Sequence, residues 1–95
     1  MKLVLIEWLD SFGCSPDWQP LDAVLKEPMQ CRSVGWLLHD GPHCKVIVPH
    51  ISDEDTGGMA AQGCGDMTIP VCSIVHMTEL DDRQAEIKSW KPIDK

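Results

Sequence analysis

The chain has 95 residues, of which 43% are hydrophobic and 24% are charged, and this balance is typical of one small globular domain rather than a disordered segment. Its 15 acidic and 8 basic residues give a net charge of −7, which excludes a protein that binds DNA or RNA through a generally basic surface. A domain this short has a thin hydrophobic core, so we expect a homo-oligomer.

The N-terminal segment 2–9 is predicted to be a strand that is apolar on both faces. One face carries Val4, Ile6 and Trp8, and the other carries Leu3, Leu5, Glu7 and Leu9. This pattern is typical of a strand that is covered on both sides or that takes part in an oligomer contact.

Segment 1–9 does not have the pattern of a secretory signal, because Glu7 interrupts its apolar run and no small-residue cleavage site follows. No stretch approaches the ~20 apolar residues that a membrane helix needs. We therefore expect a cytoplasmic protein without membrane contact.

Segment 10–19 is rich in turn residues and predicts a loop. Pro20 suits the first turn of a short helix, which is expected to continue through Leu25 and to end before Pro28.

Two strand-like segments, 30–39 and 44–51, flank the sequence Asp-Gly-Pro-His, and this arrangement predicts a β-hairpin. Gly35 within the first strand predicts a sharp bend, a bulge or a close approach of two backbones. Pro49 indicates a strand end or an edge, because it has no N–H to donate.

Segment 52–65 predicts a long mobile loop, segment 65–70 a strand, segment 71–73 a tight turn and segment 74–80 a final strand. Five strands in 80 residues predict a small SH3-like or Sm-like β-barrel with one short helix, and the alternative is an open antiparallel sheet with one helix packed on it. Residues 81–95 are expected to be a flexible or weakly helical tail.

The cysteines offer no clear site. Five in a reducing compartment are expected to be buried free thiols. There is no Cys-x-x-Cys motif, although His39 could meet His43 or Cys44 across the hairpin, with Cys64 joining from the loop. Cys64 lies between two glycines, but no signature places His50 or His76 beside it as a base. We therefore expect no metal, no cofactor and no enzymatic activity.

Recognition is the better-supported role. Trp8 and Trp36 lie on strands and are expected in the core, whereas Trp18 lies in a polar loop and is a candidate for base stacking or for an interface anchor. Arg32, Ser33 and Ser11 are candidate donors to an anionic ligand, which an acidic protein can bind only in a local pocket. The alternative is that Arg32 and Lys45 form a solvated cross-strand face.

Three motifs support a resemblance. They are Glu7-Trp8-Leu9-Asp10-Ser11, Ser33-Val34-Gly35-Trp36-Leu37-Leu38, and Gly65-Asp66-Met67-Thr68-Ile69-Pro70 followed by Ile74. As a set they resemble a group of small bacteriophage-encoded proteins over residues 4–80. The resemblance implies a setting in the host cell, where such proteins bind host factors or counter host immunity by sequestering nucleotide signals.

Two functions follow as hypotheses. In the first, a homo-oligomeric barrel sequesters a small anionic nucleotide signal, with Trp18 stacking on the base, with Ser11, Arg32 and Ser33 meeting the phosphates, and with pockets completed between subunits. In the second, an acidic, tryptophan-bearing module inhibits or redirects a host enzyme.

Overall fold

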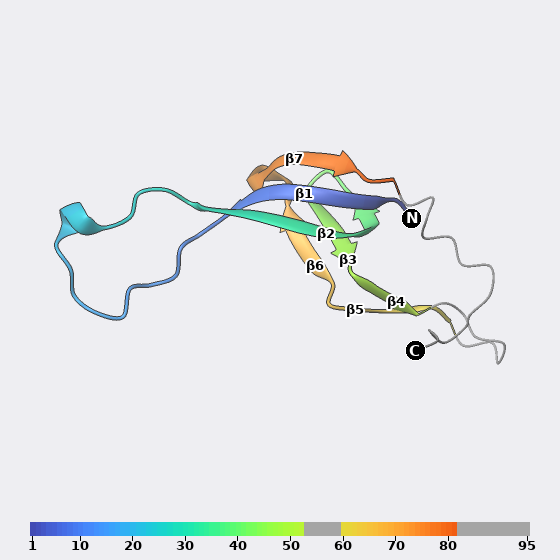
Figure 1. Ribbon diagram of the computed structural model, residues 1–95, viewed down its shortest axis with the longest axis horizontal. Helices are drawn as coiled ribbons and strands as arrows, with labels where there is room; N and C mark the ends of the chain where they lie inside the picture. Colours follow the sequence, from blue (N-terminus) through green and yellow to red (C-terminus); the bar gives the residue numbers. More distant parts are fainter. Residues whose placement is uncertain (53–59, 82–95) are drawn as a thin grey trace, which may run out of the picture.

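The computed structural model describes residues 1–52 and 60–81 (Figure 1). Within these residues the chain forms seven β-strands and two single turns of 3-10 helix. The elements are β1 (Leu3–Asp10), η1 (Leu21–Ala23), β2 (Met29–Asp40), β3 (Cys44–Val48), β4 (His50–Ser52), β5 (Gln62–Cys64), β6 (Met67–Pro70), η2 (Val71–Ser73) and β7 (Ile74–Glu79). The mainly β fold that the sequence predicts is confirmed.

Five strands form one antiparallel sheet in the order β6-β3-β2-β1-β7, and β4 pairs with β5 in a separate two-stranded ribbon (Figure 1). In the described part of the chain the five-stranded sheet is open, with β6 and β7 as its two edges. Of the predicted small barrel the described residues show the antiparallel sheet but not its closure. Closure would require hydrogen bonds between β6 and β7, which are instead the two unpaired edges and are connected by η2.

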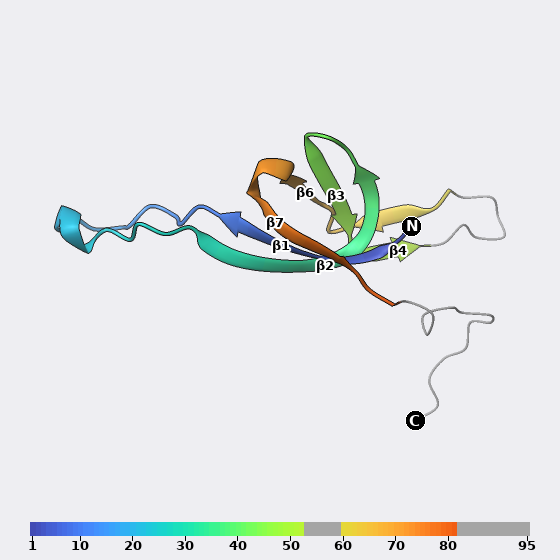
Figure 2. The ribbon, with the colours of Figure 1, turned by 90° about the horizontal axis from the view of Figure 1, so that it is seen from above.

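The sheet curls because β2 pairs with β1 along its first part and with β3 along its last part. Residues 29–36 of β2 pair with β1, and residues 36–40 pair with β3 (Figure 2). Gly35 lies at the change of partner, where an added Cβ would lie 3.1 Å from the Cβ of Ile47 and 3.1 Å from the amide nitrogen of Val48. The close approach predicted for Gly35 is confirmed.

This curl folds β3 and β6 over the same face of β1 and buries a small core. Its central residues are Val4, Ile6, Ile47 and Ile69, and the partly buried side chains packed against them are Trp8, Leu37, Ile74 and Met77. The face of β1 that the alternation groups as Val4, Ile6 and Trp8 is thus the inner face. A core of this size is expected of a short domain.

The predicted hairpin is present, and the Gly41 amide donates to the carbonyl of Cys44 over 3.1 Å at its turn. Pro49 ends β3, which is one of the two roles predicted for it, and divides the strand predicted over 44–51 into β3 and β4. The prediction of a loop over 52–65 is wrong at both ends, because β4 and β5 pair there. The rest of that loop, residues 53–59, lies outside the described residues, as does the predicted tail from residue 82 on.

The predicted helix from Pro20 to Leu25 is reduced to the single turn η1. Its N-cap residue, Pro20, makes no side-chain capping bond, and Val24 already has an extended backbone. None of the residues of η1 is buried. Without a cap or an apolar face packed against a core, a short helix gains too little to propagate.

We expect Gly35→Ala to lower the free energy of unfolding by about 1–2 kcal/mol, because the new methyl group meets the backbone of β3, which cannot move aside freely. Chemical denaturation followed by tryptophan fluorescence measures this. The matched control is Gly13→Ala, since nothing lies within 4 Å of an added Cβ there. Equal stabilities for the two variants would contradict the role assigned to Gly35.

Candidate functional site

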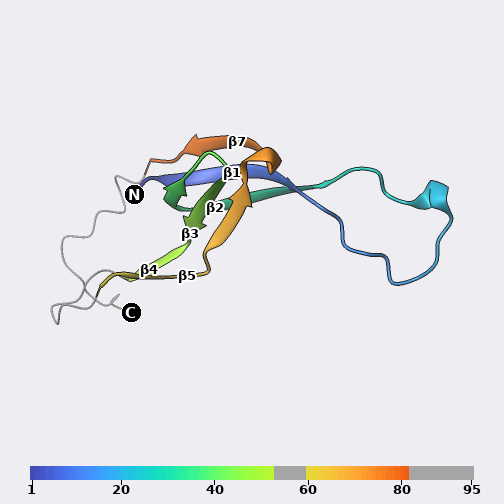
Figure 3. The ribbon, with the colours of Figure 1, turned by 180° about the vertical axis from the view of Figure 1, so that it is seen from behind.

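The longest exposed segment in the described part of the chain includes the connection between β1 and β2, residues 11–28, which we call the arm. All three views show it projecting away from the sheet, with η1 near its far end (Figures 1, 2 and 3). Every residue from 9 to 30 is exposed. The arm is therefore a surface element that is attached to the core only through the ends of β1 and β2.

The arm exposes several large apolar side chains to water. Trp18 is fully exposed, at 104%, and Leu21 is 85% exposed. The other exposed large apolar side chains of the arm are Phe12, Val24 and Leu25. Single exposed apolar residues are ordinary, but a cluster of five on one projecting segment is typical of a contact site.

The hydrogen bonds within the arm are local. Ser15 Oγ donates to the carbonyl of Asp17 over 3.3 Å, and the Ala23 amide donates to the carbonyl of Pro20 over 3.0 Å. Lys26 Nζ donates to the carbonyl of Val24 over 3.3 Å. Local bonds and an absence of burial give the arm little stability of its own, which is typical of segments that become ordered against a partner.

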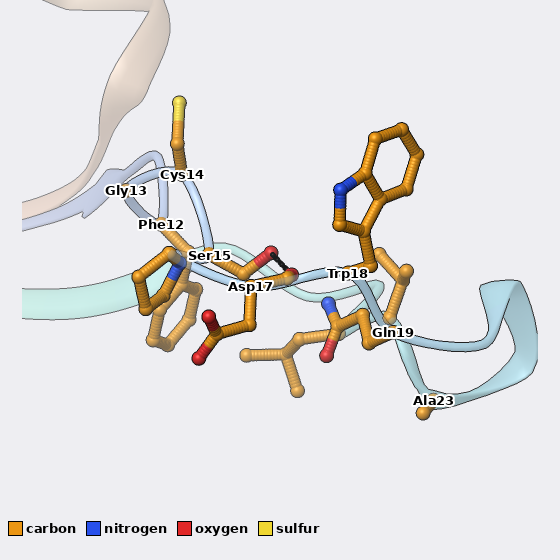
Figure 4. Close-up of a pocket in the computed structure, with 11 residues that line it drawn as sticks. Phe12, Gly13, Cys14, Ser15, Asp17, Trp18, Gln19 and Ala23 are labelled. Atoms are coloured by element: carbon orange, nitrogen blue, oxygen red, sulfur yellow. Dashed lines mark hydrogen bonds between the residues drawn. The ribbon is translucent and has the colours of Figure 1, made fainter.

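A hollow of about 770 Å³ lies within the arm and is bordered by residues 12–19 and 23–25 (Figure 4). In the close-up, Cys14 and Trp18 project to one side of the loop and Asp17 to the other (Figure 4). The lining contains a carboxylate and no arginine or lysine. Its charge therefore disfavours an anionic ligand within one chain.

The arm is acidic as well as apolar. It contains three acids, Asp17, Asp22 and Glu27, and one base, Lys26. Asp10 lies immediately before it and accepts a 2.8 Å hydrogen bond from the Ser11 amide through Oδ1. An exposed tryptophan on an acidic segment suits a partner surface that is basic around an apolar pocket.

The structure disperses the four residues predicted to bind an anionic ligand. Ser11 follows the end of β1 and Trp18 lies in the arm. Arg32 and Ser33 are neighbours on β2, so their side chains point to opposite faces of the sheet. Within one chain, Trp18 borders the hollow of the arm and Arg32 borders a second hollow, and neither hollow includes Ser11 or Ser33.

Ser33 has a structural partner. Trp8 Nε1 donates a 3.0 Å hydrogen bond to Ser33 Oγ, which joins β1 to β2 on the inner face of the sheet. The indole of Trp8 packs against the core, so this bond satisfies the one polar atom of a mostly apolar side chain. The expected core role of Trp8 is thus seen, and the serine supports it. Trp36, also expected in the core, lies opposite Leu3 and is not among the described core residues.

Arg32 lies on the opposite, outer face beside Glu7, with 3.7 Å between its Nε and Glu7 Oε2. The side chain of Arg32 is 79% exposed, so this ion pair contributes little to stability. The hollow next to it, of about 530 Å³, is also bordered by Trp8, Gln30 and Val75.

The second cation named above, Lys45, donates a hydrogen bond to Asp40 at the end of the hairpin. This bond holds the pKa of the exposed Asp40 carboxyl below its usual range. The stabilisation is complete above the ordinary aspartate pKa of about 3.9 and is lost as the pH falls through the lowered value. Lys45 therefore belongs to the hairpin rather than to a shared site with Arg32.

The cysteines are free, as expected, but they are not buried. Cys14, Cys64 and Cys72 are exposed and the other two are half-buried. A thin core has no room for five thiols in its interior. In residues 1–52 and 60–81, no group of three or more histidine, cysteine or acidic side chains is placed to hold a metal ion.

Sequence reasoning missed one pair of residues. His50 and Cys64 lie directly opposite each other in the β4–β5 ribbon. The sequence carries no strand pattern for this ribbon, because β5 is short and fully exposed. β5 also contains Gly63, where an added Cβ would lie 2.8 Å from Val48 Cγ1. No hydrogen bond joins the two side chains in the described structure, so the pair lacks the geometry of a thiolate with its base.

No family model matches this chain, and neither a curated protein nor a solved structure was found to be similar to it. The residues that the structure describes include no helix with the length and apolar character needed to cross a membrane. The site therefore has to be interpreted from its own chemistry.

We expect Ser33→Ala to lower the free energy of unfolding by about 1–2 kcal/mol, because it leaves the Trp8 indole N–H without its partner beside the core. Thermal unfolding followed by near-UV circular dichroism measures this. Ser15→Ala, which removes only a local bond in the exposed arm, is the matched control and is expected to leave stability unchanged. If Ser33→Ala unfolds at the same temperature as the wild type, the bond from Trp8 to Ser33 does not support the fold.

Proposed function

We propose that this protein is a non-enzymatic, acidic protein-interaction module whose arm binds a host enzyme and inhibits or redirects it. The observation that carries the proposal is the arm itself, an acidic segment on which the exposed Trp18 and Leu21 are each next in sequence to an aspartate. Exposed tryptophans are the residues that most often dominate a binding interface. The resemblance to bacteriophage proteins suggests the cytoplasm of a bacterial host as the setting.

The partner suited to this arm has a basic surface with an apolar pocket. The net charge of −7 favours encounter with such a surface at low salt, and the apolar side chains supply the affinity once water is excluded. An enzyme that acts on nucleic acid or on nucleotides has such a surface, because its substrate is anionic.

We also propose that the core is a variant of the SH3-like or Sm-like barrel. Support comes from the strand order β6-β3-β2-β1-β7, from the bend of β2 at Gly35, and from the one-turn η2 before the last strand. In this proposal the arm is a long insertion between the first two barrel strands, and the open edges mark an incompletely closed barrel.

The test is affinity capture from a bacterial lysate with the wild-type chain and with the double variant Trp18→Ala, Leu21→Ala. The wild type is expected to retain a defined partner at low salt, and the double variant is expected to lose it. In a titration with the purified partner, loss of the tryptophan anchor is expected to weaken binding by at least about 30-fold, which is the range of an interface hot spot.

Leu38→Ala is the matched control, because it removes an apolar side chain of 59% exposure from the sheet rather than from the arm. It is expected to retain the partner. The proposal would be contradicted if the wild type, the double variant and Leu38→Ala all captured the same proteins. It would also be contradicted if the wild type captured no protein that high salt releases.

A second candidate function is the sequestration of a small anionic nucleotide. It is supported by the hollow of about 530 Å³ beside β1 and β2, which is bordered by Arg32 and Gln30 as possible donors and by Trp8. A hollow of this volume is in the range of small-molecule sites. In this model Arg32 would exchange its exposed Glu7 partner for a phosphate.

Calorimetry against a panel of cyclic and ADP-ribose-type nucleotides tests this second function. Binding with a dissociation constant below about 100 µM that is lost in Arg32→Ala would support it. Binding that survives this substitution, or an absence of binding across the panel, would exclude the Arg32 site. The arm variants serve as controls and are expected to leave nucleotide binding unchanged.

A further inference from the structure

Among residues 1–52 and 60–81, nothing forms a covering layer over one broad face of the sheet. In Figure 2, β3 and β6 lie on one side of the layer formed by β2, β1 and β7, which is the side of the core. No described strand packs on the other side, which we call the outer face. Antiparallel sheets ordinarily present polar side chains to water on such a face.

The pairing registers place several apolar side chains on the outer face. Leu5 of β1 lies opposite Val34 of β2, and Leu3 lies opposite Trp36. The bulge between β1 and β7 adds Val75, which borders the same hollow as Glu7 and Arg32. Val34 is 50% exposed and Val75 is 64% exposed. The outer face thus presents apolar side chains on each of three neighbouring strands, with Val75 separated from Leu5 by Glu7 and His76.

The outer face is also neutral in a strongly acidic chain. Its charged side chains are Glu7 and Arg32, which lie opposite each other and form the 3.7 Å ion pair. The polar residues that share the face by register are Gln30, His76 and Thr78. Because the chain carries −7 in all, two copies repel each other over most of their surfaces but not over this one.

We propose that the outer face of β2, β1 and β7 is the contact between two copies of this chain in a symmetric dimer. A two-fold axis places the same patch against itself, so the patch must be self-complementary, and a neutral apolar patch with one balanced ion pair meets that requirement. The dimer would stack two sheets face to face and give each thin core a second apolar layer. This proposal is independent of the function assigned to the arm.

The size of the face predicts a weak dimer. Three strands about 4.8 Å apart, each contributing roughly six residues, make a patch of about 14 by 20 Å. This falls below the ~800 Å² per partner of a standard interface. We therefore expect dissociation in the micromolar range, with Leu5 and Val34 near the centre of the contact.

The experiment is sedimentation velocity of the full chain from about 1 to about 500 µM, which spans this range. The wild type is expected to pass from monomer to dimer. Val34→Lys and Val75→Lys, which place like charges across the axis, are each expected to raise the dissociation constant at least about tenfold. Val75 lies at a bulge on an edge strand, so this second variant keeps the test valid if Val34→Lys fails to fold.

Leu21→Lys is the matched control, since it makes the same kind of change on the arm at a side chain that is 85% exposed. It is expected to dimerise like the wild type. A wild type that stays monomeric at the highest concentration would overturn the proposal. So would a dimer that both face variants leave unchanged, or one that Leu21→Lys disrupts as strongly as they do.

Discussion

The fold depends on the close approach of two backbones at Gly35. Because this residue has no side chain, β2 can leave β1 and join β3 within the length of one strand. The change of partner carries Ile47 and Ile69 over Val4 and Ile6. Without this change of partner the same strands would form a sheet that encloses no hydrophobic core. A chain of 95 residues has few other apolar side chains from which to build a second core.

The elements that the sequence predicted correctly are those with strong local signals. The Asp-Gly turn marks the hairpin, Pro49 marks the end of β3, and Gly35 marks the bend. Each acts through backbone geometry that depends on one or two residues, so no knowledge of distant contacts is needed. The alternation in β1 likewise identified the Val4 face, although not that it was the inner one.

The errors arose where long-range pairing decides the outcome. The β4–β5 ribbon joins residues separated by the predicted loop, and its exposed strands have no hydrophobic pattern to reveal it. Closure of the barrel is a property of the whole sheet and leaves no local sequence signature. The dispersal of Arg32 and Ser33 follows from strand alternation, whereas the hydrogen bond from Trp8 to Ser33 required the register between β1 and β2.

The position of the arm in the chain allows its sequence and length to vary among related proteins. The arm connects two strands that are already held together by their own pairing, so changes in its length do not disturb the core. Doubling such a loop costs only about 0.6 kcal/mol in closure entropy. The arm can therefore accept substitutions and insertions as its partner changes in evolution, while the sheet keeps its structure.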